Sequence, residues 1–481
     1  MLFGMLRGMA QTFFFYDLET SGLSARSDRI MQFAGIRTDM DLNPVGEPYN
    51  IMVKLNDDTL PSPEAVLVTG ITPQSTQADG LTEAEFAELL LNDIFVADTI
   101  TVGFNNVRFD DEFIRHLFWR TFRDPYEWCW KDGCSRWDML DVVRMTRALR
   151  PEGIEWPVDD EGRPTNRLEL ITKSNGIIHS KAHDALSDVE ALIDVAKLLK
   201  EKQPKLFNYL LSIRDKKSVQ KLVNLEHKQP FVYTNGRYDM KFEKTSVAFP
   251  LTSAPNGNVA VYDLRIDPTP FVSLSDAELS KRLFASWDER KDESFVPIPV
   301  KTLQYNRCPA VAPIGVLEQS DGWKKIGLDI AICETNKNIL LKHPDFAERV
   351  RSAIEQRPPF AKSDDAEAQL YDGFIDGRDK IRIESVRNAD TRELADFHPQ
   401  FEDPRLADLL LRYKARNYSN SLSEDEVTIW EAWRASRLNS QLPGFLKSLQ
   451  RLAVTVNDDQ RFTLEELQLW AEAIMPVPDD I

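Results

Sequence analysis

Two acidic residues, Asp17 and Glu19, stand inside an apolar segment near the start of the chain, Phe13-Phe14-Phe15-Tyr16-Asp17-Leu18-Glu19-Thr20. A run of aromatic residues this dense predicts a buried strand. Because side chains alternate along a strand, the two carboxylates are expected to point the same way, where they repel each other. A cation bound between the two carboxylates removes this repulsion, and paired carboxylates favour Mg²⁺ or Mn²⁺. An isolated pair of this kind is more often a strand end that meets solvent or a lysine.

A third acid, Asp110, stands where a predicted strand gives way to a predicted helix. Residues 99–102 have strand character, Gly103 and two asparagines interrupt it, and a helix is expected from about Phe109 to 120. Asp110 then falls in the first helical turn. An acid in that position also commonly does no more than complement the helix dipole.

A fourth acid and a histidine stand at the start of a later helix. Asp184 is a plausible N-cap of a helix that runs to about Lys200, and Asp188 falls about one turn into it. His183 precedes the cap by one residue, so its side chain can lean over a metal site that the helix holds. The alternative is an exposed loop histidine beside a capping aspartate.

Two further acids, Asp138 and Asp141, are the main rivals of Asp110 as metal ligands. Both stand at the start of a predicted helix over 138–149. We interpret Asp138 as the helix cap and Asp141 as an ion-pair partner of Arg144, which is three residues away on the same helix face.

In order along the chain, Asp17-x-Glu19, Asp110, His183 and Asp188 resemble the motifs of the DEDD exonuclease superfamily, in its DEDDh branch. The resemblance implies that the four carboxylates hold two Mg²⁺ ions roughly 3.5–4 Å apart, with Mn²⁺ as a substitute. It also implies that His183 is the general base that takes a proton from the attacking water.

Longer segments resemble the bacterial exodeoxyribonuclease I family across nearly the whole chain. They are residues 104–112, 135–138, 149–153, 182–185, 368–374 and 412–417. The resemblance implies a processive enzyme of DNA repair and recombination that degrades single-stranded DNA from its 3′ end to 5′-mononucleotides. It also implies docking on the C-terminal tail of single-stranded-DNA-binding protein. Leu18 and Ser21 depart from the family pattern, and Ser21 is expected to change how the terminal base is held.

The same resemblance assigns residues that contact the substrate and the partner. The DNA-contacting set is Glu19, Thr20, Ser21, Asn105, Asn106, Arg115, Trp130 and Arg136. The pocket for the partner's tail is assigned to Arg150 and Tyr209.

The composition fits a soluble enzyme of two or three domains, with 481 residues and 42% hydrophobic residues. The net charge of −18 is unusual for a DNA-binding protein, although steering depends on the local field rather than on the sum. Arginines and aromatics interleave over residues 108–150, which suits single strands, whose bases stack without sequence preference. Core packing and a solvated helix face explain the same residues equally well.

The four cysteines have no zinc-site spacing and fit reduced thiols in the cytoplasm. The apolar N-terminal segment is too short for a signal peptide, and no segment has the length of a membrane span. We therefore expect a cytoplasmic monomer without a membrane partner.

Three domains are expected. Residues 1–202 predict a ribonuclease-H-like α/β exonuclease domain with a mixed sheet, residues 203–356 a β-rich, SH3-like barrel domain, and residues 357–481 an all-helical domain that closes over the DNA groove. In the last domain Leu406, Leu409, Leu410 and Tyr413 share one helix face, as do Ile429, Trp430 and Trp433. Arg412, Lys414 and Arg416 are expected to face the DNA strand. The chemistry is not expected to need residues after about 360.

Two alternatives remain open. A DEDDh exonuclease acting on RNA or short oligonucleotides would have the same metal ligands, because the 2′-hydroxyl is sensed elsewhere. A non-catalytic strand-binding scaffold would be favoured by a missing carboxylate, and none is missing.

Overall fold

The computed structural model describes residues 11–179, 184–359 and 362–476. The predicted base, His183, lies outside these residues. The chain forms two compact units, each built from separate stretches of sequence. Unit 1 contains Met1–Ser135, His179–Leu192 and Ala361–Ile481, and unit 2 contains Arg136–Ile178 and Ile193–Phe360. The predicted metal ligands all fall in unit 1.

The sheet of the exonuclease part is mixed, as predicted, and has the strand order β3-β2-β1-β4-β5. Its strands are β1 (Thr12–Thr20), β2 (Ile30–Thr38), β3 (Tyr49–Met52), β4 (Thr99–Gly103) and β5 (Ser135–Asp138), at whose first residue unit 1 ends. β1 pairs antiparallel with β2 and parallel with β4, so the strand that carries Asp17 and Glu19 is central. The register with β2 shifts between Glu19 and Thr20, where a bulge ends the regular pairing.

The two faces of β1 differ as side-chain alternation requires. Phe14, Tyr16 and Leu18 belong to a buried cluster that also contains Phe33 of β2 and Phe113 of α4 (Asp110–Arg120). Asp17 and Glu19 alternate with these residues and therefore project from the opposite face. Apolar burial on one face thus fixes the register that places both carboxylates together on the other.

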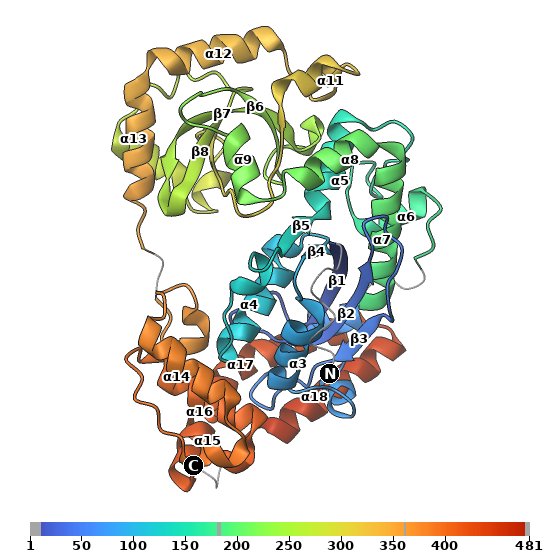
Figure 1. Ribbon diagram of the computed structural model, residues 1–481, viewed down its shortest axis with the longest axis vertical. Coiled ribbons are helices and arrows are strands. Elements are labelled where there is room, and N and C mark those ends of the chain that lie inside the picture. The colour runs from blue at the N-terminus through green and yellow to red at the C-terminus, as the bar shows by residue number, and fades with distance from the viewer. Residues whose placement is uncertain (1–10, 180–183, 360–361, 477–481) are drawn as a thin grey trace. The chain divides into compact units, whose positions relative to one another are not determined.

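The helices of unit 1 come from both ends of the chain. Those of the exonuclease part are α1 (Pro63–Thr69), α2 (Pro73–Gln77), α3 (Glu83–Leu89), α4 and the first part of α7 (Ala185–Lys202). The C-terminal segment adds α14 (Gly377–Asn388), α15 (Thr391–Asp396), α16 (Arg405–Asn417), α17 (Glu424–Ala453) and α18 (Asp458–Ile474). Helices α17 and α18, drawn in red in Figure 1, both pack against α1.

The C-terminal helices share a hydrophobic core with the exonuclease part. Leu406, Leu409, Leu410 and Tyr413 of α16 are buried, as predicted, against Trp119 and Phe122 at the end of α4. The prediction for α17 was only partly right. Trp430 and Trp433 stack with their ring centroids 5.2 Å apart, but Ile429 is 58% exposed, because the apolar contact of this helix is narrower than the sequence pattern implies.

Unit 2 contains a second sheet, the β-rich part that the sequence predicts. Its strand order is β10-β6-β7-β8-β9, and each strand pairs antiparallel with its neighbour. The strands are β6 (Phe231–Thr234), β7 (Thr245–Ala254), β8 (Asn258–Asp263), β9 (Val300–Leu303) and β10 (Ala310–Pro313). Asn256 and Gly257 form the turn between β7 and β8 with φ of +61° and +68°, which explains the Asn-Gly pair there.

The main helices of unit 2 are α5 (Met139–Leu149), α6 (Leu168–Ser174), α8 (Pro204–Ser212), α9 (Lys216–Leu222), α10 (Asp276–Leu283), α12 (Ile330–Lys342) and α13 (Pro344–Glu355). The last two appear in yellow and orange beside the green strands in Figure 1, and α13 packs on β7. Among all the helices described, none is long and apolar enough to cross a membrane.

Candidate active site

Three carboxylates from two distant segments meet on the face of β1 that carries Asp17 and Glu19. Ligand oxygens of Asp17, Glu19 and Asp188 all lie within 4.8 Å of one another. β1 supplies the first two, and the first turn of α7 supplies Asp188. The prediction that Asp17 and Glu19 point the same way is therefore confirmed, and Asp188 joins them across 169 residues of sequence.

The electrostatics of this acid cluster are unfavourable without a cation. Burial raises the pKa of Asp17 well above its usual value, and the charges of Asp110, Glu19 and Asp188 raise it further. Burial likewise raises the pKa of Glu19 to about 8, with added repulsion from Asp188 and Asp110. Asp110 thus acts electrostatically on the cluster, as a fourth acid. An all-carboxylate donor set with this repulsion fits a hard divalent cation.

The start of α4 is held by a buried hydrogen-bonded group next to Asp110. The hydroxyl of Tyr16 on β1 donates to Asp111, and Asn106 Nδ2 donates to the same carboxylate oxygen over 3.3 Å. Asn105 has a left-handed backbone with φ of +71°, which an asparagine tolerates well. The fully buried side chain of Asn106 therefore belongs to the interior. It supports the helix that carries Asp110, and its role as a DNA contact stays a prediction.

The start of α7 has the predicted cap. Asp184 Oδ1 accepts a hydrogen bond from the backbone N–H of Ser187 over 3.1 Å. His179 Nε2 lies 2.5 Å from Asp188 Oδ1, a contact that the sequence reasoning missed. The signal available in the sequence was a second histidine nine residues before Asp188, but nothing local indicates which of two loop histidines reaches back to the helix.

The loop after β1 uses its polar side chains internally. Thr20 Oγ1 donates to the backbone carbonyl of Gly22 over 2.7 Å. Ser21 is fully buried, and its Oγ accepts a hydrogen bond from the backbone N–H of Arg29 over 2.8 Å. The side chain of Ser21 therefore closes the loop, and its contact with the terminal base stays a prediction.

The remaining predicted DNA contacts fall in both units. Trp130 is 63% exposed and is free to stack on a base. The guanidinium of Arg115 lies 5.6 Å from the ring centre of Tyr126 and donates to Glu112 over 3.0 Å. In unit 2, Arg136 is mostly buried and donates to the backbone carbonyl of Asn306 over 2.7 Å.

The predicted partner contacts and the two rival acids also lie in unit 2. Arg150 donates to the carbonyl of Val316 over 3.1 Å, and Tyr209 is half-buried on α8. Asp138 caps α5 by accepting from Leu140 N, and Asp141 pairs with Arg144 over 2.7 Å. The sequence interpretation of both rival acids is confirmed.

Three basic residues of α16 do not lie where the sequence suggested. Arg412, Lys414 and Arg416 were expected to face a DNA strand, but all three are buried. Lys414 Nζ lies 2.7 Å from both carboxylate oxygens of Glu426, and the two arginines pair with other buried acids. A helical pattern of arginine and lysine usually indicates a face exposed to solvent. Here acids that are distant in the sequence pair with these side chains, and the face is buried.

A mixed sheet whose central strand and two helix starts gather four acids defines a metal-dependent exonuclease of the ribonuclease-H-like class. The family comparisons agree. Residues 14–196 match the family described as Exonuclease, residues 214–356 the Exonuclease I SH3-like domain, and residues 364–474 the Exonuclease I C-terminal domain.

Whole-chain relatives narrow the class. Exodeoxyribonuclease I of Haemophilus influenzae is 40% identical over 450 residues, which are 93% of this chain and 95% of that protein. Exodeoxyribonuclease I of Escherichia coli is 40% identical over 465 residues, which are 96% and 97% of the two chains. The chain belongs to the exodeoxyribonuclease I family.

Solved structures agree over the same length. E. coli exonuclease I in complex with a dA16 oligonucleotide has a TM-score of 0.93 at 39% identity, covering 97% of this chain and 100% of that one. A zinc-bound E. coli complex with single-stranded DNA has a TM-score of 0.92, and a complex of SSB and exonuclease I with the inhibitor CFAM has 0.89. Both are 38% identical and cover 97% of this chain and 100% of the other.

Proposed function

We propose that this protein is a Mg²⁺-dependent 3′→5′ exonuclease that degrades single-stranded DNA to 5′-mononucleotides. The observation that carries the proposal is the acid cluster of Asp17, Glu19 and Asp188, whose ligand oxygens lie within 4.8 Å of one another, with the charge of Asp110 acting on it. Membership of the exodeoxyribonuclease I family supports the choice of substrate, as do the oligonucleotide complexes of the E. coli protein.

The four carboxylates would hold two divalent ions. Bound ions would make an attacking water acidic and neutralise charge on the leaving 3′ oxygen. The protein's own contribution is to fix the direction of each carboxylate. β1 fixes Asp17 and Glu19 by its register, and the capped first turn of α7 fixes Asp188, whose Oδ1 also contacts His179. Mg²⁺ is the ion proposed, because an all-oxygen donor set suits it, and Mn²⁺ is expected to substitute.

The general base is assigned to His183. It stands one residue before the cap of α7 and five residues before Asp188, so a short loop can bring its ring to the water that attacks the phosphorus. A neutral imidazole takes a proton readily near pH 7. His179 is less suited to this role, because its Nε2 already contacts Asp188.

The strand is proposed to pass over Glu19, Thr20, Ser21, Asn105, Asn106, Arg115 and Trp130 in unit 1. Arg136 of unit 2 is proposed separately as a DNA-contacting residue. An exposed Trp130 offers a stacking surface, and base stacking tolerates any sequence. The helical segment 357–481 is proposed to close over the groove and slow release of the DNA, which gives processivity. Product length under a heparin trap tests this, and distributive products from the wild-type protein would refute it.

The direct test uses end-labelled single-stranded DNA, duplex DNA and RNA, each with Mg²⁺ and with EDTA. We expect Mg²⁺-dependent release of mononucleotides from the 3′ end of single-stranded DNA, and none from the matched Asp17→Asn variant. Faster cleavage of RNA than of DNA would favour the exoribonuclease alternative. DNA binding without cleavage in every condition would favour the scaffold alternative.

A partner surface is proposed at Arg150 and Tyr209 for the acidic, apolar C-terminal tail of single-stranded-DNA-binding protein. The SSB complex of a family member supports this class of partner. Arg150→Ala is expected to weaken binding of the tail peptide about tenfold, the effect of losing one charged contact. Hydrolysis of naked DNA should be unchanged. Equal peptide affinity of both proteins, measured by fluorescence anisotropy at low salt, would refute the placement.

The biological setting follows from the same family. We propose that the enzyme acts as a monomer in DNA repair and recombination. The cytoplasm is proposed as its location, because Cys129, Cys134 and Cys333 are buried free thiols, as expected in a reducing compartment.

A further inference from the structure

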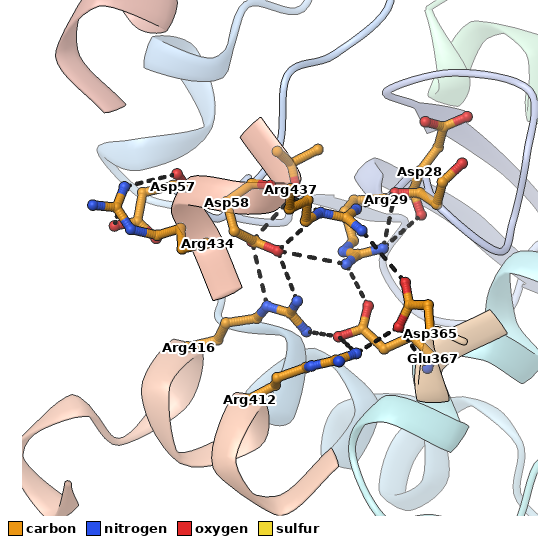
Figure 2. A network of polar contacts seen from close by, with 12 residues as sticks. Asp28, Arg29, Asp57, Asp58, Asp365, Glu367, Arg412, Arg416, Arg434 and Arg437 are labelled. Atoms are coloured by element: carbon orange, nitrogen blue, oxygen red, sulfur yellow. Dashed lines mark hydrogen bonds and ion pairs between the residues drawn. The ribbon is translucent and has the colours of Figure 1, made fainter. Parts of the chain in front are cut away.

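A network of buried charges connects the C-terminal segment of unit 1 to its exonuclease part (Figure 2). We call it the ion network. Its side chains are at most 9% exposed, and they are Arg29, Asp58, Glu83, Arg120, Glu367, Arg412, Arg416 and Arg437. The exonuclease part supplies two arginines and two acids, whereas the C-terminal segment supplies one acid and three arginines. Asp58 of the exonuclease part pairs with Arg416 and Arg437, and Arg29 of the same part pairs with Glu367, so the compensation of these charges depends on both parts.

The closest pairs cross between the two segments. Glu367 Oε2 lies 2.7 Å from Nη2 of Arg29, and its Oε1 lies 2.6 Å from Nη1 of Arg416. Asp58 Oδ2 lies 2.7 Å from Nη2 of Arg416 and 3.4 Å from Nε of Arg437. Each of these acids thus bridges two arginines, and removing one partner would leave a buried charge uncompensated.

Stacked rings hold the C-terminal arginines in place. The guanidinium of Arg412 lies 4.1 Å from the ring centre of Trp433, and those of Arg416 and Arg437 lie 5.6 and 5.5 Å from it. A planar guanidinium that is stacked and doubly paired has little freedom left. The network is therefore rigid enough to determine the position of whatever else it contacts.

What else it contacts is the loop that follows the metal-binding strand. Arg29 ends this loop, and its Nη1 donates to the carbonyl of Ser27 over 3.1 Å. Arg437, from α17, donates to the same carbonyl over 2.9 Å. The C-terminal segment and the exonuclease part thus hold one backbone position of the loop jointly.

The loop leads directly to Glu19. The backbone N–H of Ser21 donates to the carbonyl of Arg29 over 2.8 Å, and the N–H of Arg29 donates to Ser21 Oγ over 2.8 Å. The carbonyl of Ser21 accepts from Ser62 N over 2.7 Å. Ser21 is two residues after Glu19, and regular pairing of β1 with β2 shifts after Glu19. The position of Glu19 at this strand end therefore depends on how Arg29 closes the loop.

We propose that Glu367 and Arg416 are positioning residues that act through Arg29 and Ser21 to hold Glu19 in its metal-binding place. The inference rests on the proposed function, because it deepens the account of the same metal site. It also revises the expectation that the chemistry does not need residues after about 360. The C-terminal segment supplies charges that pair with buried charges of the exonuclease part, in addition to its proposed closure over the DNA groove.

The test uses the full chain with the substitutions Glu367→Gln and Arg416→Met, which keep size and remove charge. The exposed arginine of the same segment, Arg378, pairs with Glu402 at the surface, so Arg378→Met is the matched control. Three quantities are measured well below each variant's unfolding temperature. They are Mn²⁺ affinity, by titration without DNA, and kcat and KM on a short single-stranded oligonucleotide.

We expect Mn²⁺ affinity and kcat to fall about 10- to 100-fold in both variants, the usual effect of losing a residue that orients a metal ligand. KM should change little, and the control should match the wild type. Variants that unfold at lower temperature but keep the wild-type Mn²⁺ affinity and kcat would overturn the proposal, because the network would then serve stability alone.

If both variants fail to fold, Ser21→Ala decides, because it removes only the acceptor for Arg29 N. A weakened Mn²⁺ affinity in Ser21→Ala supports the proposal, and wild-type affinity overturns it. Failure of the proposed function has a different signature, namely wild-type protein that binds no Mn²⁺ and cleaves no strand.

Discussion

The acid cluster and the ion network both contain carboxylates with little exposure to solvent, yet the pKa values of these carboxylates shift in opposite directions. Burial raises the pKa of Glu19 to about 8, and neighbouring acids add to the rise. Burial also acts to raise the pKa of Asp58, but Arg416, Arg437 and Arg29 outweigh it and lower that pKa to about 2. What decides the direction is the sign of the nearest charges.

The difference separates a binding site from a structural contact. The pKa of Glu367 lies well below its usual value, because Arg416 and Arg29 outweigh the effect of burial. The negative charge of Glu367 is thus compensated by arginines of the protein itself. The pKa of Asp17 lies well above its usual value, because burial and three neighbouring acids all raise it. A buried cluster of like charges that the chain does not neutralise indicates that a cation from outside completes it.

The largest expected effect is loss of activity when the acid cluster is broken. Asp17→Ala should lower turnover by about 10³-fold or more, since a metal ion contributes several kcal/mol to the transition state. The fold and DNA binding should persist, because the Asp17 carboxylate is proposed to bind the ions rather than to pack the core. Hydrolysis of labelled single-stranded DNA and the thermal unfolding curve measure both. Normal Mg²⁺-dependent hydrolysis by a folded Asp17→Ala protein would refute the metal assignment.

The next effect concerns the proposed base. His183→Ala should lower kcat by about 10²–10⁴-fold, the usual contribution of general acid–base catalysis. Mn²⁺ affinity should stay at the wild-type value, because His183 is not a predicted ligand. Single-turnover rates on a short oligonucleotide measure the change, with a metal titration as control. Unchanged kcat would move the base role to His179, which contacts Asp188.

A pair of neutralising substitutions tests the comparison itself. Asp58→Asn should lower the unfolding free energy by about 3–5 kcal/mol, because it leaves buried arginines without their acid. Asp17→Asn should raise the unfolding free energy in EDTA, since it relieves repulsion. Urea unfolding measures both values. Saturating Mg²⁺ at about 100 times its Kd should add about 2.7 kcal/mol to the wild type, and less to Asp17→Asn. Destabilisation by Asp17→Asn in EDTA would contradict the comparison.

The smallest expected effect is a pair of opposite pH dependences in metal-free protein. The pKa of Glu19 is raised from 4.5 to about 8, so its contribution to stability is present below pH 4.5 and is lost as pH rises through about 8. The pKa of Asp58 is lowered from 3.8 to about 2, so its contribution is present above pH 3.8 and is lost as pH falls through about 2.

Substitution separates the two contributions. Glu19→Gln should flatten the unfolding free-energy curve between pH 4.5 and about 8, and Asp58→Asn should flatten it between about pH 2 and pH 3.8. Urea unfolding in EDTA across both ranges measures them, with the wild type as reference. A curve between pH 4.5 and about 8 that is unchanged in Glu19→Gln would show that Glu19 ionises normally.

Most of the exonuclease secondary structure follows from the sequence. The strand expected within residues 13–20 is observed as Thr12–Thr20, and the helix expected over 109–120 as Asp110–Arg120. Local signals suffice here, because apolar periodicity and helix caps depend on near neighbours. The roles of Ser21 and Asn106 did not follow, since their hydrogen-bond partners are set by how loops fold back.

The sequence by itself determined that Asp17 and Glu19 share a strand face, that Asp110 and Asp188 begin helices, and which family the order of these residues resembles. The alternation of side chains along a strand and the capping of helices depend only on neighbouring residues, so both can be predicted from the sequence. Only the tertiary structure brought Asp188 to within 4.8 Å of the other two acids and enclosed Arg29 between Asp58 and Glu367. The physical reason is that a charged side chain gives no local signal of its partner. Whether it faces water, a metal or a buried opposite charge depends on residues hundreds of positions away.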